Sequence, residues 1–256
     1  MKRKQITVDR STFPSIFQPL LNNVVYDSSC SPEARVYYFP SHQVFLKRAP
    51  KGTLKKEALL TSYFYTLGLA TEVLSYHSDE NDWLLTAEVL GEDATHEDYL
   101  SDPLRLCDTM AEALRFLHTQ PYHDCPIPDR LSDYFNTARE GYRIGRFDAS
   151  FYPSDITPEK ALAIVEEKGH LLKADTLIHG DYCLPNILLN DWRLSAFIDL
   201  GNGGVGDRHI DLYWGIWTLR FNLHTDRYCR RFMDAYGKDL IDKERLAVVA
   251  AAETLG

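Results

Sequence analysis

Long apolar runs are missing from this chain of 256 residues. Its longest largely apolar stretches, at 59–70 and 246–252, fall short of the roughly 18 to 20 residues that a membrane-spanning helix needs. The chain starts with charged residues, as a secretion signal does, but polar residues follow where such a signal requires an apolar segment. We therefore expect a cytoplasmic protein that has no membrane partner.

Paired cysteines and an excess of positive charge are missing as well. The five cysteines are scattered, odd in number and contain no C-x-x-C pair, which argues against both a disulfide framework and a zinc site. The formal net charge of −9 speaks against a nucleic-acid partner and leaves room for a cationic small molecule. With 45% hydrophobic residues, the chain can form one compact unit or two small lobes.

The pattern of residues changes after about one third of the chain. Runs rich in valine, tyrosine, phenylalanine and leucine predict short strands at 23–27, 35–39, 43–48, 71–77 and 82–89, interrupted by one helix at about 53–67. Beyond residue 93, Asp102-Pro103 and Thr157-Pro158 each open a helix, and two short strands at 186–190 and 194–200 precede further helices. We predict an α+β fold with a small β-rich lobe (1–90), a hinge near 86–92 and a larger, mostly helical lobe (91–256).

A glycine-rich segment, "GNGGVG" at 201–206, matches the dinucleotide-binding pattern G-x-G-x-x-G letter for letter. A dinucleotide-binding fold needs several more β-α units after this motif. Only 50 residues follow Gly206, and their pattern predicts helices. The context therefore argues against a dinucleotide site.

The stretch "HGDYCLPNILL" at 179–189 carries a different chemistry. Phosphoryl transfer uses one aspartate to orient and deprotonate a hydroxyl, and an asparagine with a second aspartate to hold magnesium. Asp181 fits the first role, and Asn186 and Asp199 fit the second, because Mg²⁺ prefers oxygen ligands. A metal-hydrolase site built on His179 is the competing interpretation, but such a site needs more histidines at ligand spacing.

The segment 178–212, with its "HGDxCLPNI" signature, resembles the catalytic core of the aminoglycoside phosphotransferases, specifically their 3′-phosphotransferase branch, whose fold is similar to that of protein kinases. The resemblance implies ATP or GTP and Mg²⁺ as cofactors. It implies an ion pair between Lys47 and Glu57 that clamps the nucleotide phosphates, adenine contacts from the backbone of Ala87 and Val89, and a phosphate contact from Ser31. His179 and Asp211 are expected to brace the catalytic loop.

The acceptor is less well defined by the resemblance. It implies that Glu253 and the terminal carboxylate of Gly256 return to the acceptor pocket and bind ammonium groups, with Asp148 and Glu140 as further acidic candidates. The chain departs from the family at Asn202, where arginine is usual, and the segment before the catalytic loop carries three arginines. An aminoglycoside is the expected acceptor; another hydroxylated metabolite or antibiotic, or a catalytically silent nucleotide-binding relative, is the alternative. We expect a monomer or weak dimer.

One helical stripe after residue 207 is conspicuously apolar. The spacing of its members places them on one helix face and predicts that they are core residues rather than a stacking platform. They are Ile210, Tyr213, Trp214, Trp217 and Phe221.

Overall fold

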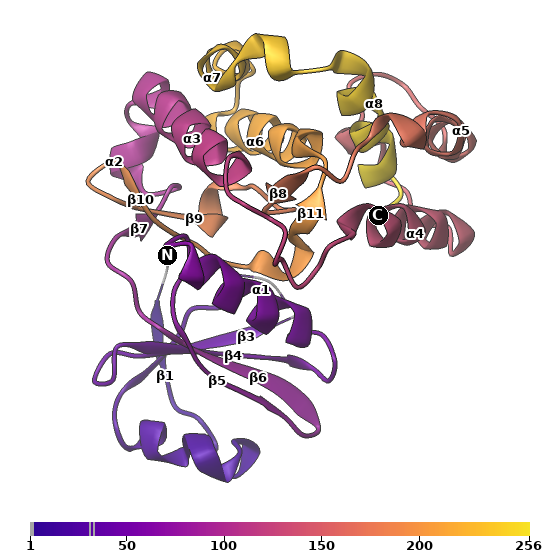
Figure 1. The fold of residues 1–256 in the computed structure, drawn as a ribbon. Coiled ribbons are helices and arrows are strands. Elements are labelled where there is room, and N and C mark those ends of the chain that lie inside the picture. Colours follow the sequence, from indigo (N-terminus) through magenta and orange to yellow (C-terminus); the bar gives the residue numbers. More distant parts are fainter. Residues whose placement is uncertain (1–2, 31, 33) are drawn as a thin grey trace.

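The β-type runs of the first third form a six-stranded antiparallel sheet in the order β1-β2-β3-β4-β6-β5 (Figure 1). The computed structural model describes residues 3–30, 32 and 34–256. The strands are β1 (Lys4–Ile6), β2 (Val25–Asp27), β3 (Arg35–Phe39), β4 (Val44–Pro50), β5 (Val73–Ser78) and β6 (Asn81–Ala87). Their alternating pattern buries Phe39, Leu46 and Trp83 against the short helical turn η2 (Ser15–Asn22) and the residue that follows a second turn, η1 (Arg10–Thr12).

Helix α1 (Lys55–Thr66) lies between this sheet and the rest of the molecule (Figure 1). The Asp82 carboxylate accepts a hydrogen bond of 2.9 Å from the backbone of Leu54 and so fixes the start of the helix against β6. One face buries Ala58 against the sheet, while Leu60 and Phe64 belong to the core of the helical lobe. The helix therefore couples the two lobes.

The second lobe is mostly helical and includes two small sheets, ordered β10-β9-β7 and β11-β8. Its strands are β7 (Glu92–Asp93), β8 (Thr176–Ile178), β9 (Ile187–Asn190), β10 (Arg193–Phe197) and β11 (Gly204–Gly206). Its α-helices are α2 (Glu97–Leu100), α3 (Pro103–His118), α4 (Arg130–Arg143), α5 (Pro158–Lys168), α6 (Arg208–Leu223), α7 (Cys229–Tyr236) and α8 (Lys243–Glu253). Short 3-10 turns complete it: η3 (Ala149–Phe151), η4 (Gly169–Leu171), η5 (Leu184–Asn186), η6 (Leu200–Asn202) and η7 (Lys238–Leu240).

This architecture confirms the predicted two-lobed α+β fold. The side chains of Asp102 and Thr157 cap α3 and α5, each with proline at the first helical position. The sequence pattern did not identify β1, η2 or α4. Helix α4 is strongly amphipathic, but arginine, aspartate and glutamate make it polar on average, so its buried face is carried by only a few residues, including Tyr134 and Ala138.

The glycine-rich segment adopts a structure that differs from a nucleotide-binding turn. Gly204–Gly206 is itself a strand that pairs with β8, and a side-chain carbon at Gly204 would lie 2.8 Å from Ile127. Asp199 was expected to close a strand, but β10 ends at Phe197 and Asp199 has a left-handed backbone with φ of 58°. Among the described residues, no helix is long and apolar enough to cross a membrane.

Candidate active site

The loop predicted to be catalytic, 179–189, begins where β8 ends. The carboxylate of Asp211 in α6 accepts the backbone N–H of His179 at 2.8 Å and that of Gly180 at 2.7 Å. Gly180 has φ of 81°, and a side-chain carbon there would lie 1.9 Å from the carbonyl oxygen of Asn202, so only glycine fits. The loop is thus held rigidly just before Asp181.

Asp181 is half-buried and is oriented by Asn186. The Asn186 side-chain nitrogen donates to Asp181 Oδ2 at 2.9 Å and to the Asp181 carbonyl at 3.0 Å. This contact turns the Asn186 Oδ1 oxygen away from Asp181. Asn186 therefore orients the Asp181 carboxylate through its side-chain nitrogen, and its side-chain oxygen remains available to another partner.

Asp199 is brought beside Asn186 by the backbone, because the N–H of Ile198 donates to the Asn186 carbonyl at 3.1 Å. The Asp199 carboxylate is about half exposed. One amide oxygen and one carboxylate from neighbouring segments suit a hard cation such as Mg²⁺. Within the part of the chain that the structure describes, no three histidine, cysteine, aspartate or glutamate side chains gather in a metal-binding group.

Lys47 in β4 joins the two lobes. Its Nζ contacts Glu57 Oε1 at 2.9 Å and Oε2 at 2.8 Å in α1, and Asp199 Oδ1 of the helical lobe at 2.5 Å. Burial alone would lower the pKa of Lys47, but the charges of Asp199 and Glu57 outweigh it and raise that pKa well above its ordinary value. A fixed positive charge therefore lies at the junction of the lobes.

The hinge after β6 carries the residues predicted to meet adenine. The Ala87 N–H donates to the Glu72 carbonyl at 3.0 Å, and the Ala87 carbonyl accepts from the Thr71 hydroxyl. An adenine contact from Ala87 would therefore have to use the second lone pair of that carbonyl. Val89 lies half-buried two residues beyond the end of the strand. Ser31 lies outside the described residues.

The C-terminal segment packs on the helical lobe and carries Glu253. Glu253 Oε1 accepts from the Tyr134 hydroxyl at 2.8 Å and from Trp214 Nε1 at 3.2 Å. Burial raises the pKa of Glu253 to about 7, against the lowering effect of these hydrogen bonds, and the nearby charge of Asp181 adds to the rise. Glu253 is therefore close enough to Asp181 to be affected by its charge.

Contacts with α4 and with the loop after it fix the end of the chain. The Leu255 carbonyl lies against Gly141, where a side-chain carbon would come within 1.5 Å, and the Asp148 N–H donates to the Thr254 carbonyl at 2.9 Å. Gly256 itself is exposed. The described contacts thus dock the terminal turn on the helical lobe.

The other two acidic candidates make local contacts. Asp148 is exposed and accepts the backbone N–H of Ser150 at 2.9 Å, which caps η3. Glu140 is exposed and forms a two-bond ion pair with Arg143, with distances of 2.7 and 2.5 Å. The side chains of Asp148 and Glu140 thus bond to their own segments, whereas the side chain of Glu253 bonds to Tyr134 and Trp214 and interacts with the charge of Asp181.

Sequence reasoning missed Arg130, the first residue of α4. Its Nε donates to the Asn202 carbonyl at 2.7 Å, its guanidinium lies 5.7 Å from the centre of the Tyr134 ring, and its charge acts on Glu253. The residue falls in a polar stretch whose pattern gives no functional signal. Nearby, Lys56 of α1 contacts Asp133 of α4 at 2.6 Å and forms a second bridge between the lobes.

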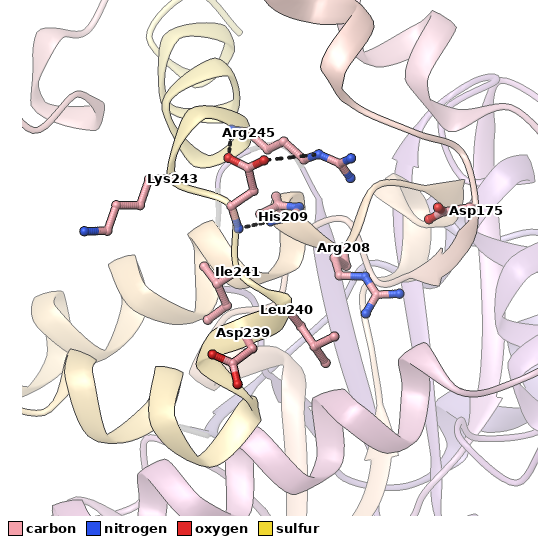
Figure 2. A pocket seen from close by; sticks show the side chains of 9 residues that line it. Asp175, Arg208, His209, Asp239, Leu240, Ile241, Lys243 and Arg245 are labelled. Atoms are coloured by element: carbon pink, nitrogen blue, oxygen red, sulfur yellow. Dashed lines mark hydrogen bonds and ion pairs between the residues drawn. The ribbon is translucent and has the colours of Figure 1, made fainter.

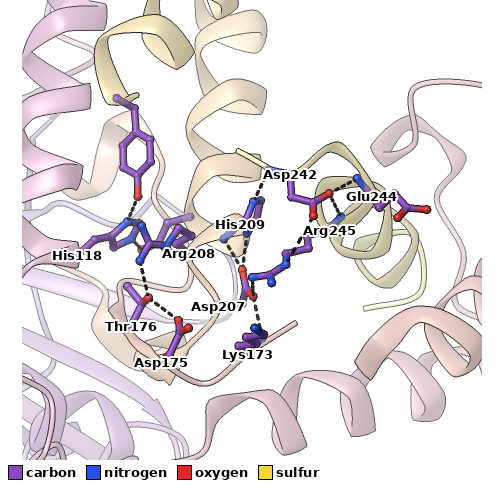
Figure 3. A network of polar contacts seen from close by, with 12 residues as sticks. His118, Lys173, Asp175, Thr176, Asp207, Arg208, His209, Asp242, Glu244 and Arg245 are labelled. Atoms are coloured by element: carbon purple, nitrogen blue, oxygen red, sulfur yellow. Dashed lines mark hydrogen bonds and ion pairs between the residues drawn. The ribbon is translucent and has the colours of Figure 1, made fainter. Parts of the chain in front are cut away.

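An open concavity of about 680 Å³ on the helical lobe is separate from this site (Figure 2). Arg208, His209 and the start of α8 line it, and none of the predicted site residues does. Its neighbours form a network in which His209 bridges Asp207 at 2.6 Å and the backbone of Asp242 at 2.8 Å (Figure 3). This network fastens the start of α8 to the start of α6, so it positions the helices that carry Glu253 and Asp211.

Two lobes, a lysine that bonds to both of them and a braced aspartate-asparagine loop define a phosphotransferase of kinase-like fold. The sequence profile of the phosphotransferase enzyme family matches residues 33–249. The chain belongs to this family.

Individual relatives agree with this family. The chain is 45% identical over 258 residues to a probable aminoglycoside 3′-phosphotransferase of Lactococcus lactis, covering 99% of this chain and 98% of the relative. Among solved structures, it resembles the aminoglycoside phosphotransferase APH(3″)-Id of Streptomyces rimosus, with a TM-score of 0.71, 26% identity and 89% and 92% of the two chains covered. A type VIII aminoglycoside 3′-phosphotransferase shares the fold at a TM-score of 0.74 and 22% identity, over 99% and 94% of the chains.

Proposed function

We propose that the protein transfers the γ-phosphoryl group of ATP to a hydroxyl group of an aminoglycoside, at the 3′ position, and so confers resistance to that antibiotic. The observation that carries the proposal is the arrangement around Asp181. A carboxylate oriented by an asparagine, a second carboxylate that could bind a cation and a lysine that could bind phosphate lie close together where the two lobes meet.

In the proposed reaction, Asp181 accepts a hydrogen bond from the acceptor hydroxyl and takes its proton as the hydroxyl oxygen attacks the γ-phosphorus. A new O–P bond forms, the bond between the γ-phosphorus and the bridging oxygen breaks, and the electron pair of that bond leaves with ADP. Lys47, aligned by Glu57, binds the phosphates that remain on ADP. Asn186 Oδ1 and the Asp199 carboxylate would hold Mg²⁺, which neutralises phosphate charge when bound.

Three further observations support a cationic acceptor. Glu253 lies near Asp181, the terminal turn is docked on the helical lobe, and an aminoglycoside 3′-phosphotransferase of Streptomyces fradiae is 29% identical to this chain over 243 residues, 87% of each chain. A solved complex of APH(3″)-Id contains ADP and streptomycin, at a TM-score of 0.69 and 25% identity over 86% and 90% of the chains. By analogy, we assign the nucleotide to the cleft beside Lys47 and the acceptor to the side of Glu253.

One observation favours a second candidate, a kinase acting on a less basic hydroxylated compound. The Arg130 guanidinium lies close enough to Glu253 to stabilise its charge. A cation at this position opposes the binding of a polyamine sugar. An acceptor with fewer ammonium groups would avoid that repulsion.

A turnover assay distinguishes these candidates. Purified protein with ATP and Mg²⁺ is assayed for ADP release with kanamycin A, neomycin, streptomycin and simple amino alcohols, and the product is located by phosphorus NMR. We expect ADP release with kanamycin A and neomycin and a phosphate ester at the 3′ position. Turnover of uncharged alcohols alone would refute the aminoglycoside proposal. If no acceptor stimulates ADP release, the proposed phosphotransferase activity itself is refuted.

A further inference from the structure

The aromatic residues of α6 do not form the buried stripe that the sequence predicts. Ile210 is buried, but Trp214 and Trp217 are only half-buried, and 60% of the Phe221 surface is exposed. The rings of Trp217 and Phe221 stack with their planes 10° apart and their centres 4.9 Å apart. Because Phe221 has water on one side, this stack is a surface feature rather than core packing.

Trp214 and Phe151 join this stack through edge-to-face and tilted ring contacts, and the four rings form one aromatic ledge, which consists of Phe151, Trp214, Trp217 and Phe221. The ring centres of Trp214 and Trp217 are 5.5 Å apart, and Phe151 lies 5.8 Å from the first ring and 5.9 Å from the second. From Trp214 to Phe221, seven residues of helix span about 10 Å. This length is comparable to that of one or two sugar rings.

The inner end of the ledge is joined to the acceptor side of the site. Trp214 Nε1 donates to Glu253 Oε1 at 3.2 Å, and Glu253 interacts electrostatically with Asp181. The ledge therefore begins at the group assigned to acceptor binding and runs outward from it.

The same helix also fixes the ledge relative to the reacting groups. Thr218, the neighbour of Trp217, accepts the backbone N–H of Leu184 at 3.1 Å, and Asp211 holds the N–H groups of His179 and Gly180. The Tyr213 hydroxyl donates to the Phe151 carbonyl at 2.5 Å and secures the loop that carries Phe151. A ligand on the ledge would thus be held in a defined register with Asp181.

Building on the proposed function, we infer that the aromatic ledge is an acceptor subsite that binds sugar rings beyond the one that is phosphorylated. The apolar C–H faces of a sugar ring cover an indole or phenyl face, while the hydroxyl and ammonium groups at the ring edge stay in water. The ledge would make the enzyme favour acceptors with three or more rings over those with two. Its contribution would depend little on salt, since it comes from apolar contact, whereas the Glu253 contribution would weaken as salt increases.

The test compares neamine, a two-ring aminoglycoside, with neomycin, which carries the same two rings and two more. We expect Phe221→Leu and Trp217→Leu each to raise the KM for neomycin about fivefold or more, and the KM for neamine and for ATP less than twofold, with kcat nearly unchanged. The matched control is Phe116→Leu, because Phe116 lies in α3 with 51% of its surface exposed and is not part of the ledge. Repeating the assay at high salt should leave the ratio of variant to wild-type KM unchanged.

Binding measured by calorimetry and tryptophan fluorescence separates the two hypotheses. Neomycin should change the tryptophan fluorescence of the wild type, and this change should be smaller in Trp217→Phe. If neamine and neomycin are both phosphorylated but the ledge variants affect them equally or not at all, the ledge is not a subsite and the proposed function stands. If the wild type neither binds nor phosphorylates either compound, both the proposed function and the ledge are refuted.

Discussion

His118 Nε2 and Asp211 Oδ2 lie 3.0 Å apart, and both side chains are almost completely shielded from solvent. The Tyr236 hydroxyl lies 2.8 Å from the other ring nitrogen of His118. Since the Asp211 carboxylate can only accept, Nε2 carries the hydrogen and Nδ1 accepts from Tyr236. Burial lowers the pKa of His118 despite the bond to Asp211, so this ring stays neutral and directs Asp211 at the catalytic loop.

Replacing Asp211 with asparagine should therefore impair catalysis more than nucleotide binding. An amide offers one accepting oxygen where the carboxylate accepts two backbone N–H groups, so one of these N–H groups faces an NH₂ group. We expect kcat to fall roughly 10- to 100-fold and unfolding free energy to fall by about 3 kcal/mol, with the KM for ATP little changed. Steady-state kinetics and urea unfolding measure these effects, and Tyr236→Phe, which leaves both loop contacts intact, is the control. Unchanged kcat in Asp211→Asn would contradict the bracing role.

The Lys47–Glu57 pair permits a test that separates stability from function. Lys47→Met should leave Glu57 buried without its partner and destabilise the fold by about 3 to 5 kcal/mol, besides raising the KM for ATP about tenfold or more. The double variant Lys47→Met, Glu57→Gln removes the unpaired charge, so it should recover most of the stability and none of the ATP affinity. Thermal unfolding and nucleotide titration measure the two quantities. Recovery of ATP binding in the double variant would show that Lys47 does not contact the nucleotide.

The parts of the molecule that sequence predicted best are those with local signals. The strand at 35–39 was placed to the residue, and Asp102 and Thr157 marked two helix starts, because alternation and capping depend on near neighbours. The motif at 179–189 likewise consists of near neighbours, and it marks a loop that Asp211 braces. Its roles in catalysis and metal binding stay predictions.

Features that depend on distant segments could not be predicted. Arg130 approaches the site only because α4 packs against the segment that contains Asn202, 72 residues further along the chain. The spacing of apolar residues in α6 shows which of them share a helix face, but not whether another element covers that face. Phe221 was therefore assigned to the core although it lies at the surface. Which backbone groups of the hinge are available to a nucleotide could not be predicted either, because the Ala87 N–H is already bonded to the Glu72 carbonyl of a neighbouring segment.

The two candidate metal ligands should differ in their importance. Asp199→Ala removes the charged ligand and should lower kcat by about 10²-fold or more at saturating Mg²⁺, while Asn186→Ala should chiefly raise the Mg²⁺ concentration needed for half-maximal rate. Asn186→Ala also frees Asp181 from its orienting contact, so a smaller loss in kcat is expected as well. The rate is measured against Mg²⁺ concentration after treatment with a chelator, and the exposed carboxylate variant Asp226→Ala is the control. Full activity of chelated protein without added divalent ion would refute the metal site.

Because of Glu253, we expect kcat/KM for the acceptor to depend on pH. Because its pKa is raised to about 7, the side chain is largely neutral at pH 6 and charged at pH 8. The value of kcat/KM for a cationic aminoglycoside should therefore rise as pH increases through 7 and then level off. In Glu253→Gln this rise should flatten, with kcat/KM reduced about tenfold at pH 8 and nearly unchanged at pH 6.

Glu253 should affect the stability of the fold in the opposite direction: stability should fall, not rise, as pH increases through 7. A carboxyl group whose pKa is higher in the folded state than in the unfolded chain stabilises the fold while it is protonated, so that contribution is complete below about pH 4.5 and is lost as pH rises through 7. The loss should not exceed about 3 kcal/mol. Glu253→Gln keeps a neutral side chain at every pH, so it should be more stable than the wild type at pH 8 although it binds the acceptor less tightly. Urea unfolding at pH 6 and pH 8 tests this pairing: a variant that is weaker in acceptor binding and also less stable at pH 8 would mean that Glu253 serves the fold, and not the acceptor, in its charged form.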